Sequence, residues 1–198
     1  MNTLFELTAF PEGFLYQPEF LSESEESALL ARFGGLEFRP FDFHGYIAKR
    51  RTVAYGFEYD FSSREAAPTE AIPEFLTGLR TKAANWLAIA PEPIVEAVIT
   101  EYPPGAPIGW HRDVPQFGWI IGVSLASSCK MRLKPYKKTG RIIPIDLERR
   151  SAYVMRGPAR WQYQHSISPV KELRYSVTFR TPNAGLKHEL KHGQLNPD

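Results

Sequence analysis

The feature that most constrains the fold of this 198-residue chain is a series of short β-rich segments in its C-terminal half. Turn-forming residues separate the segments, as at Pro103–Gly105 and Lys137–Gly140. No helical pattern interrupts the series, so we expect neighbouring strands to pair antiparallel in a sandwich or jelly roll. The segments are Val95–Tyr102, Gly118–Ala126, Lys130–Lys134, Ile142–Leu147, Ala152–Met155, His165–Ile167 and Leu173–Thr181.

Two helices are predicted before this series. The first covers Glu23–Phe33, where Ser22 and Glu25 form a capping-box pattern and a pair of glycines follows. The second covers Pro73–Leu87, with proline at its start and apolar residues at helical spacing. Further strands near Leu36–Phe43 and Arg51–Gly56 would extend one sheet. The fold class we predict is mainly β (α+β), a sandwich buttressed by N-terminal helices, in a single domain over residues 1–198.

Composition limits the class of protein. The single cysteine, Cys129, excludes an internal disulfide and a cysteine-rich zinc module. No apolar stretch is long enough to span a bilayer, and no signal-peptide pattern precedes the first helix. A net charge of +2 permits an anionic partner without requiring one. We expect a cytoplasmic protein with no membrane association, a monomer without an obligate protein partner.

Three residues form a candidate metal site. His111 and Asp113 lie two positions apart, and in extended chain such side chains point the same way. His165 lies on a later strand, far enough along the chain for the sandwich to return it to the same place. Two imidazoles and a carboxylate leave coordination positions open, which suits non-heme Fe(II) oxygen chemistry. Alone, however, a histidine near an aspartate is more often an ordinary surface pair.

A second candidate site lies on the last predicted strand. Alternation places Arg174, Ser176 and Arg180 on one face, while aromatic and aliphatic residues occupy the other, core face. Two arginines that project into a cavity need anions, and a dicarboxylate such as 2-oxoglutarate supplies two. The alternative is a solvated strand with two surface arginines, which predicts nothing about the metal residues.

Taken together, these residues resemble the AlkB family of 2-oxoglutarate/Fe(II)-dependent dioxygenases. The resemblance is carried by Tyr102-Pro-Pro-Gly-Ala-Pro-Ile-Gly-Trp-His-Arg-Asp113, by His165 and by Arg174-Tyr-Ser-Val-Thr-Phe-Arg180, and it covers Val95 to Thr181. It implies a double-stranded β-helix (jelly-roll) core over residues 95–181. It also implies a nucleotide-recognition lid near residues 36–60, and residues 183–198 are left as a polar C-terminal tail.

The resemblance further implies the roles of individual residues. Fe(II) would be held by His111, Asp113 and His165, and O2 would react there. The co-substrate 2-oxoglutarate would be held by Arg174 and Arg180 with the Tyr102 hydroxyl. Thr100 and Ser176 stand where the family's pattern has asparagines. Because both keep a hydrogen-bonding group, we expect both to contact the co-substrate.

The activity that the resemblance implies is oxidative demethylation of N-alkylated bases in DNA or RNA, as in the repair of alkylation damage, with release of formaldehyde, succinate and CO2. A flipped base would need planar neighbours, and Tyr55, Phe57 and Trp110 are the candidates, although plain sheet packing would explain them equally well. Candidate phosphate contacts are Arg51, Lys130, Arg132 and Lys134, although a solvated strand face would look the same. A protein or small-molecule substrate is the alternative.

Two other classes of function remain open. His188-Glu-Leu-Lys-His192 matches the H-E-x-x-H pattern of zinc hydrolases, but only six residues follow it and none can supply a third ligand. A non-catalytic jelly-roll domain that binds nucleic acid through its basic strand is the other class. Nucleic-acid binding by a chain that takes up no metal would favour it.

Overall fold

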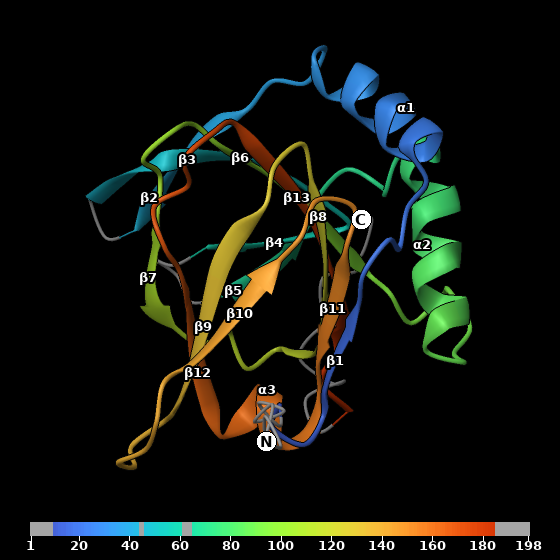
Figure 1. Ribbon diagram of the computed structural model, residues 1–198. Helices are drawn as coiled ribbons and strands as arrows, with labels where there is room; N and C mark the ends of the chain where they lie inside the picture. The colour runs from blue at the N-terminus through green and yellow to red at the C-terminus, as the bar shows by residue number, and fades with distance from the viewer. Residues whose placement is uncertain (1–9, 44–45, 61–64, 185–198) are drawn as a thin grey trace, which may run out of the picture.

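A computed structural model describes residues 10–43, 46–60 and 65–184 (Figure 1). Within this part of the chain, a seven-stranded sheet has the order β1-β11-β8-β13-β6-β3-β2, and a four-stranded sheet has the order β10-β9-β12-β7. Neighbouring strands in both of these sheets pair antiparallel. The larger sheet consists of β1 (Phe14–Gln17), β2 (Arg39–Phe43), β3 (Tyr46–Tyr55), β6 (Glu96–Tyr102), β8 (Phe117–Leu125), β11 (Ala152–Met155) and β13 (Arg174–Pro182).

The remaining elements of the described chain are a second sheet, a hairpin and the helices. The four-stranded sheet consists of β7 (Ile108–His111), β9 (Cys129–Pro135), β10 (Ile143–Leu147) and β12 (Tyr163–Ile167). A separate hairpin is made by β4 (Phe57–Asp60) and β5 (Glu65–Pro68). The helices are α1 (Glu23–Phe33), α2 (Glu74–Trp86) and the short α3 (Gly157–Trp161). None of the helices described is long and apolar enough to cross a membrane.

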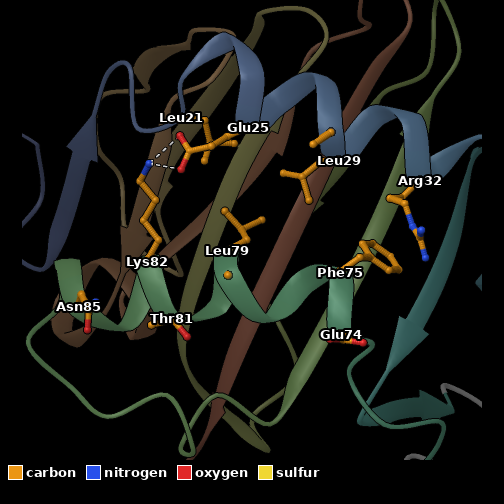
Figure 2. Close-up of a pocket in the computed structure, with 12 residues that line it drawn as sticks. Leu21, Glu25, Leu29, Arg32, Glu74, Phe75, Leu79, Thr81, Lys82 and Asn85 are labelled. Atoms are coloured by element: carbon orange, nitrogen blue, oxygen red, sulfur yellow. Dashed lines mark hydrogen bonds and ion pairs between the residues drawn. The ribbon is translucent and has the colours of Figure 1, made fainter.

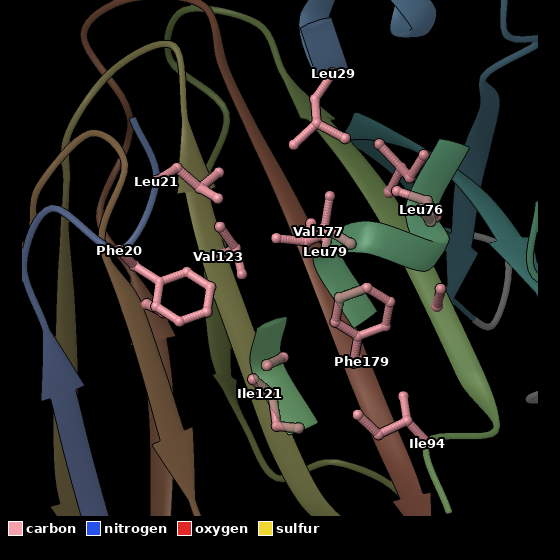
Figure 3. Packing of buried hydrophobic residues seen from close by; sticks show 14 of the residues in the cluster. Phe20, Leu21, Leu29, Leu76, Leu79, Ile94, Ile121, Val123, Val177 and Phe179 are labelled. Atoms are coloured by element: carbon pink, nitrogen blue, oxygen red, sulfur yellow. The ribbon is translucent and has the colours of Figure 1, made fainter. Parts of the chain in front are cut away.

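The two long helices cover the outer face of the seven-stranded sheet. The predicted capping box is present at α1, because Ser22 Oγ accepts from the Glu25 amide and the Glu25 carboxylate accepts from the Ser22 amide. The side chains of β13 and α2 meet in a buried cluster that includes Leu76, Val177 and Phe179 (Figure 3). Removing this apolar surface from water holds the helix layer on the sheet.

A groove remains between the two helices, on the side away from the sheet (Figure 2). The Lys82 ammonium closes one end by donating to both carboxylate oxygens of Glu25, at 2.7 and 2.8 Å. Leu29, Leu79 and Phe75 line the groove. This ion pair is partly exposed, so it contributes little stability by comparison with the apolar contacts beneath it.

A second buried cluster fills the space between the two sheets. Tyr102, Phe117 and Met131 belong to it, and they come from different strands. Strand β13 therefore has an apolar face toward the helices and an arginine-bearing face toward the second sheet, as the alternation predicted. The fold class, a mainly β jelly roll buttressed by N-terminal helices, is confirmed.

The structure also contains elements that the sequence pattern did not predict. Strands β1 and β7 have four residues each, and β7 includes Gly109, which weakens the strand signal. The prediction that no helix interrupts the strand series was wrong, because α3 lies between β11 and β12. Its Gly157-Pro158 start resembles a turn, yet proline is also favoured in the first turn of a helix.

Candidate metal centre

The structure brings the three predicted metal ligands together in the space between the sheets. His111 ends β7 and faces His165 across the β7–β12 pair, and Asp113 follows two residues later. One possible ligand atom from each of the three side chains lies within 4.8 Å of the others. The imidazole centroids are 4.1 Å apart, and His165 Nε2 lies 3.6 Å from Asp113 Oδ2. This arrangement can hold one metal ion from one side.

The protonation states suit a divalent cation. Burial and the neighbouring His111 lower the pKa of His165 to about 3, and burial also lowers the pKa of His111. Burial disfavours ionisation of Asp113, but the charge of Arg180, with His165 and His111, outweighs this effect and holds its pKa well below the usual range. At neutral pH the site therefore offers two neutral imidazoles and one carboxylate, the forms that bind a metal.

Two further details fit a metal ion. His111 Nδ1 lies 2.9 Å from the carbonyl oxygen of Gly109, which can only accept, so this nitrogen carries the proton and Nε2 keeps its lone pair. Asp113 Oδ2 is buried and has no hydrogen-bond partner among the described residues. A buried anionic oxygen without a partner is costly, and a cation at this position would satisfy it.

Arg180 holds the other oxygen of the aspartate ligand. Its Nε and Nη2 donate to Asp113 Oδ1 at 3.1 and 2.8 Å, and its Nη1 donates to the Glu96 carboxylate. Burial opposes the charge on Arg180, but Glu96 and Asp113 outweigh it and raise the pKa of the guanidinium. The contact of this arginine with the co-substrate stays a prediction; its hydrogen bonds in the structure are with the metal ligand Asp113 and with Glu96.

Arg174 lies deeper on the same strand and has capacity for an anion. Its side chain is 2% exposed, Nε donates to Ser124 Oγ at 3.1 Å, and Nη1 has no hydrogen-bond partner among the described residues. The guanidinium carbon lies 4.7 Å from the centre of the Tyr102 ring. A carboxylate placed here would satisfy Nη1, so this position fits one end of a dicarboxylate.

The remaining predicted co-substrate residues lie beside Arg174. Ser176 is paired with Thr100 across the β13–β6 register, and both are buried. The hydroxyls of Ser176 and Tyr102 are 3.5 Å apart. The alternation along β13 and β6 thus places three hydroxyl groups on the face of the sheet that carries Arg174.

Sequence reasoning missed a buried arginine that supports the ligand loop. Arg160, on α3, is 3% exposed, and among the described residues its hydrogen bonds go to backbone carbonyls. Its Nε donates to Gly118 at 3.0 Å, and its Nη2 lies 3.2, 2.8 and 3.0 Å from the carbonyl oxygens of Asp113, Val114 and Phe117. These contacts fix the segment that follows Asp113. A hint in the sequence was an arginine within an otherwise turn-like segment, five residues before His165.

A tyrosine near the centre was also missed. The Tyr153 ring lies across Gly122 of the neighbouring strand, so that a Cβ at Gly122 would come within 2.3 Å of the ring. Tyr153 stacks on Phe14 with centroids 6.0 Å apart. Burial raises the pKa of its hydroxyl, and the charge of Asp113 adds to this effect. Only glycine at position 122 leaves room for this ring.

The structure places the first three predicted substrate-contacting residues in three different environments. Tyr55 is buried in the cluster beneath the helices, so ordinary packing describes it. Arg51 pairs with Glu101 at 2.7 Å, and Tyr175, whose ring packs beneath the helices, donates to the same carboxylate. Phe57 packs against the cluster between the sheets.

The other predicted contacts lie away from the metal-facing side. Trp110 lies on the face of β7 opposite to His111, and its ring packs against Arg132 and Lys134. Arg50 precedes Arg51 on β3, and its charge adds to the effect of burial, which lowers the pKa of His111. The H-E-x-x-H segment at His188–His192 lies outside the described residues.

Comparison with known proteins identifies the class. The profile of the 2OG-Fe(II) oxygenase superfamily matches residues 13–180. The chain therefore belongs to this superfamily, whose members use Fe(II), 2-oxoglutarate and O2, and the predicted cofactors are confirmed.

Within the superfamily the chain is similar in sequence to ALKBH8 proteins. It is 29% identical over 172 residues to the mouse tRNA (carboxymethyluridine(34)-5-O)-methyltransferase ALKBH8, covering 83% of this chain and 26% of that protein. It is 26% identical over 198 residues to protein L905 of Acanthamoeba polyphaga mimivirus, covering 92% of this chain and 90% of that protein. The chain thus spans about a quarter of the ALKBH8 relative.

Solved structures show the same fold. The structure of OsALKBH1 superposes with a TM-score of 0.67 at 15% identity, covering 85% of this chain and 96% of that one. A prolyl hydroxylase from Trichoplax adhaerens, in complex with a hypoxia inducible factor peptide fragment, superposes with a TM-score of 0.64 at 14% identity, covering 88% and 86%.

The first prediction concerns the metal. His111→Ala, Asp113→Ala and His165→Ala should each abolish high-affinity Fe(II) binding in anaerobic titration, because a site of three protein ligands has none to spare. The double variant His188→Ala/His192→Ala should bind Fe(II) like the unaltered protein. Iron binding that depends on the second pair and survives loss of the first would contradict the assignment.

The second prediction concerns Arg160. Arg160→Met should weaken Fe(II) binding about 10–100-fold, because the backbone that carries Asp113 loses its support. Arg156→Met is the matched control, since this side chain lies over Trp119, 4.9 Å from the ring centre, instead of on the ligand loop. Iron affinity and the thermal midpoint without metal should be measured together. A lower midpoint with unchanged iron affinity would show that Arg160 only stabilises the fold.

Proposed function

We propose that this chain oxidatively demethylates N-alkylated bases in nucleic acid, with RNA as the favoured polymer. The observation that carries the proposal is the sequence match, over 83% of this chain, to a protein named for its action on tRNA, together with the His111–Asp113–His165 triad. The methyl transfer in that protein's name is not carried over, because the match covers only 26% of it. The residues gathered here suit an oxidation.

In the proposed reaction His111, Asp113 and His165 would hold the iron, and Arg174 would bind one carboxylate of 2-oxoglutarate. With these groups bound, the centre supplies an oxidation in which O2 converts 2-oxoglutarate to succinate and CO2 while a C–H bond of the substrate becomes C–OH. Arg180 keeps Asp113 Oδ1 occupied, which leaves Oδ2 for the metal.

The product of that oxidation accounts for demethylation. A methyl group on a ring nitrogen becomes N–CH2–OH, which is a hemiaminal. Its hydroxyl proton leaves as the C–O double bond forms, the N–C bond breaks, and the ring nitrogen takes up a proton. Formaldehyde and the unmodified base are released. The enzyme has only to present the methyl carbon to the iron, and we propose Phe57, which is partly buried against the cluster between the sheets, as the residue that contacts the flipped base.

The third prediction concerns the co-substrate. Arg174→Met should raise the 2-oxoglutarate requirement by an amount equivalent to about 2–5 kcal/mol, because a desolvated charge-assisted contact is lost. The variant without ligand should be at least as stable as the unaltered protein, since the buried guanidinium has an unsatisfied nitrogen. Arg39→Met, on an exposed position of β2, is the control. Equal co-substrate affinity in all three proteins would exclude Arg174 as the anchor.

The fourth prediction tests the substrate. Iron-loaded protein should release formaldehyde and succinate in equal amounts when given oligonucleotides that carry an N-methylated base, and more with RNA than with DNA. A panel of methylated RNA, DNA and tRNA should be compared with methylated peptides. Succinate formation stimulated only by a peptide or small molecule would replace the nucleic-acid proposal and leave the oxygenase chemistry in place.

A further inference from the structure

The outer face of the four-stranded sheet carries a group of basic and aromatic side chains. In the part of the chain that the structure describes, α1 and α2 cover the seven-stranded sheet, and no helix lies over the outer face of β10-β9-β12-β7 (Figure 1). We propose that this outer face binds the backbone of a single-stranded nucleic acid and guides it over the edge of β7 to the metal. The inference rests on the proposed function and adds the form and path of the substrate.

The centre of this surface is Trp110 with two cations. Lys134 Nζ lies 4.4 Å and the Arg132 guanidinium carbon 5.0 Å from the centre of the indole ring. Arg132 is fixed further by donating to Ser166 Oγ at 3.0 Å. The ring holds two like charges close together, and their mutual repulsion favours any anion that binds between them. Phosphate beside an aromatic ring is the pattern that single-stranded nucleic acid fits.

The structure separates the basic residues of β9 into two kinds. Lys130 is paired with Asp146 of the adjacent strand at 2.8 Å, so its charge is already balanced. Arg132 lies opposite Pro144 in the same pair of strands. The anion-binding capacity of the strand therefore lies with Arg132 and Lys134, although all three residues alternate onto the same face.

A second cation–aromatic pair extends the surface beyond β7. The Arg112 guanidinium carbon lies 3.8 Å from the centre of the Tyr136 ring, and Arg112 Nη1 donates to the Trp161 carbonyl at 3.3 Å. Arg112 lies between the two ligands His111 and Asp113 in the sequence. Positive charge thus continues from the outer face of the sheet to the loop that carries the metal ligands.

The position of β7 explains how a polymer on the outer face reaches the metal. β7 is an edge strand of the four-stranded sheet, so in the described part of the chain no further strand of this sheet lies beyond it. Trp110 faces outward on this strand, and the next residue, His111, faces the metal site. A strand that stacks one base on Trp110 can pass the next nucleotide around the edge. A continuous duplex would have to break its base pairs to do so, which favours single strands and loops.

The experiment measures binding of an unmethylated 15-nucleotide single-stranded RNA at several salt concentrations. The double variant Arg132→Gln/Lys134→Gln should make the slope of log K against log salt shallower by about 1.4, because two phosphate contacts are lost at about 0.7 each. Trp110→Leu should weaken binding at least about fivefold, because a base loses its stacking partner. Lys130→Gln, from the same strand face, is the matched control and should make the slope shallower by less than about 0.7, the amount expected for one lost phosphate contact.

Thermal midpoints of all variants should be recorded to show that each is folded. An unchanged slope in a folded Arg132→Gln/Lys134→Gln protein would overturn the inference. A change of slope in Lys130→Gln as large as that in the double variant would also overturn it. Binding of an acidic peptide of the same charge as tightly as RNA would also overturn it. Because the RNA carries no methyl group, this result does not depend on demethylation. If the unaltered protein and its variants bind RNA as expected here but the iron-loaded protein releases no formaldehyde from methylated oligonucleotides, the proposed function is wrong and this inference stands.

Discussion

The buried carboxylate of Asp113 is the group on which the rest of the site depends. Burial alone would raise its pKa, and the positive charges around it, Arg180 first, outweigh burial and lower the pKa. Arg180 also fixes one carboxylate oxygen, while Arg160 fixes the backbone beyond it. An anion held by buried cations from two distant elements is oriented before the metal arrives, which reduces the cost of assembling the site.

The register of the two sheets converts this local arrangement into a reaction centre. β13 pairs with β6 so that Arg174 lies opposite Tyr102, and β12 pairs with β7 so that His165 lies opposite His111. A slip of one residue in either pair would turn these side chains to the opposite face. The apolar clusters on both sides of β13 resist such a slip, because Val177 and Phe179 would leave the helix side. Packing of the core therefore also fixes the chemistry.

Much of the fold and of the metal centre could be predicted because the signals are local. A capping box and apolar spacing define α1 and α2, and alternation on β13 assigns Arg174 and Phe179 to opposite faces. Substrate-facing residues were harder to predict. Tyr55 and Phe57 are both aromatic and nearly adjacent, yet one is buried beneath the helices and the other packs between the sheets. The intervening Gly56 has a positive φ of 82° and ends the alternation.

The sequence by itself determined the ligand set, the order of the strands along the chain and the face on which the β13 arginines lie, because residue types and a period of two are properties of the chain alone. Only the tertiary structure decided which partners those groups meet. It joined Arg180 to Asp113 over 67 positions, placed Arg160 on the ligand loop, and paired Lys130 with Asp146 while leaving Arg132 and Lys134 on Trp110. These contacts depend on how strands pair and sheets pack, and such long-range geometry has no local signature in the sequence.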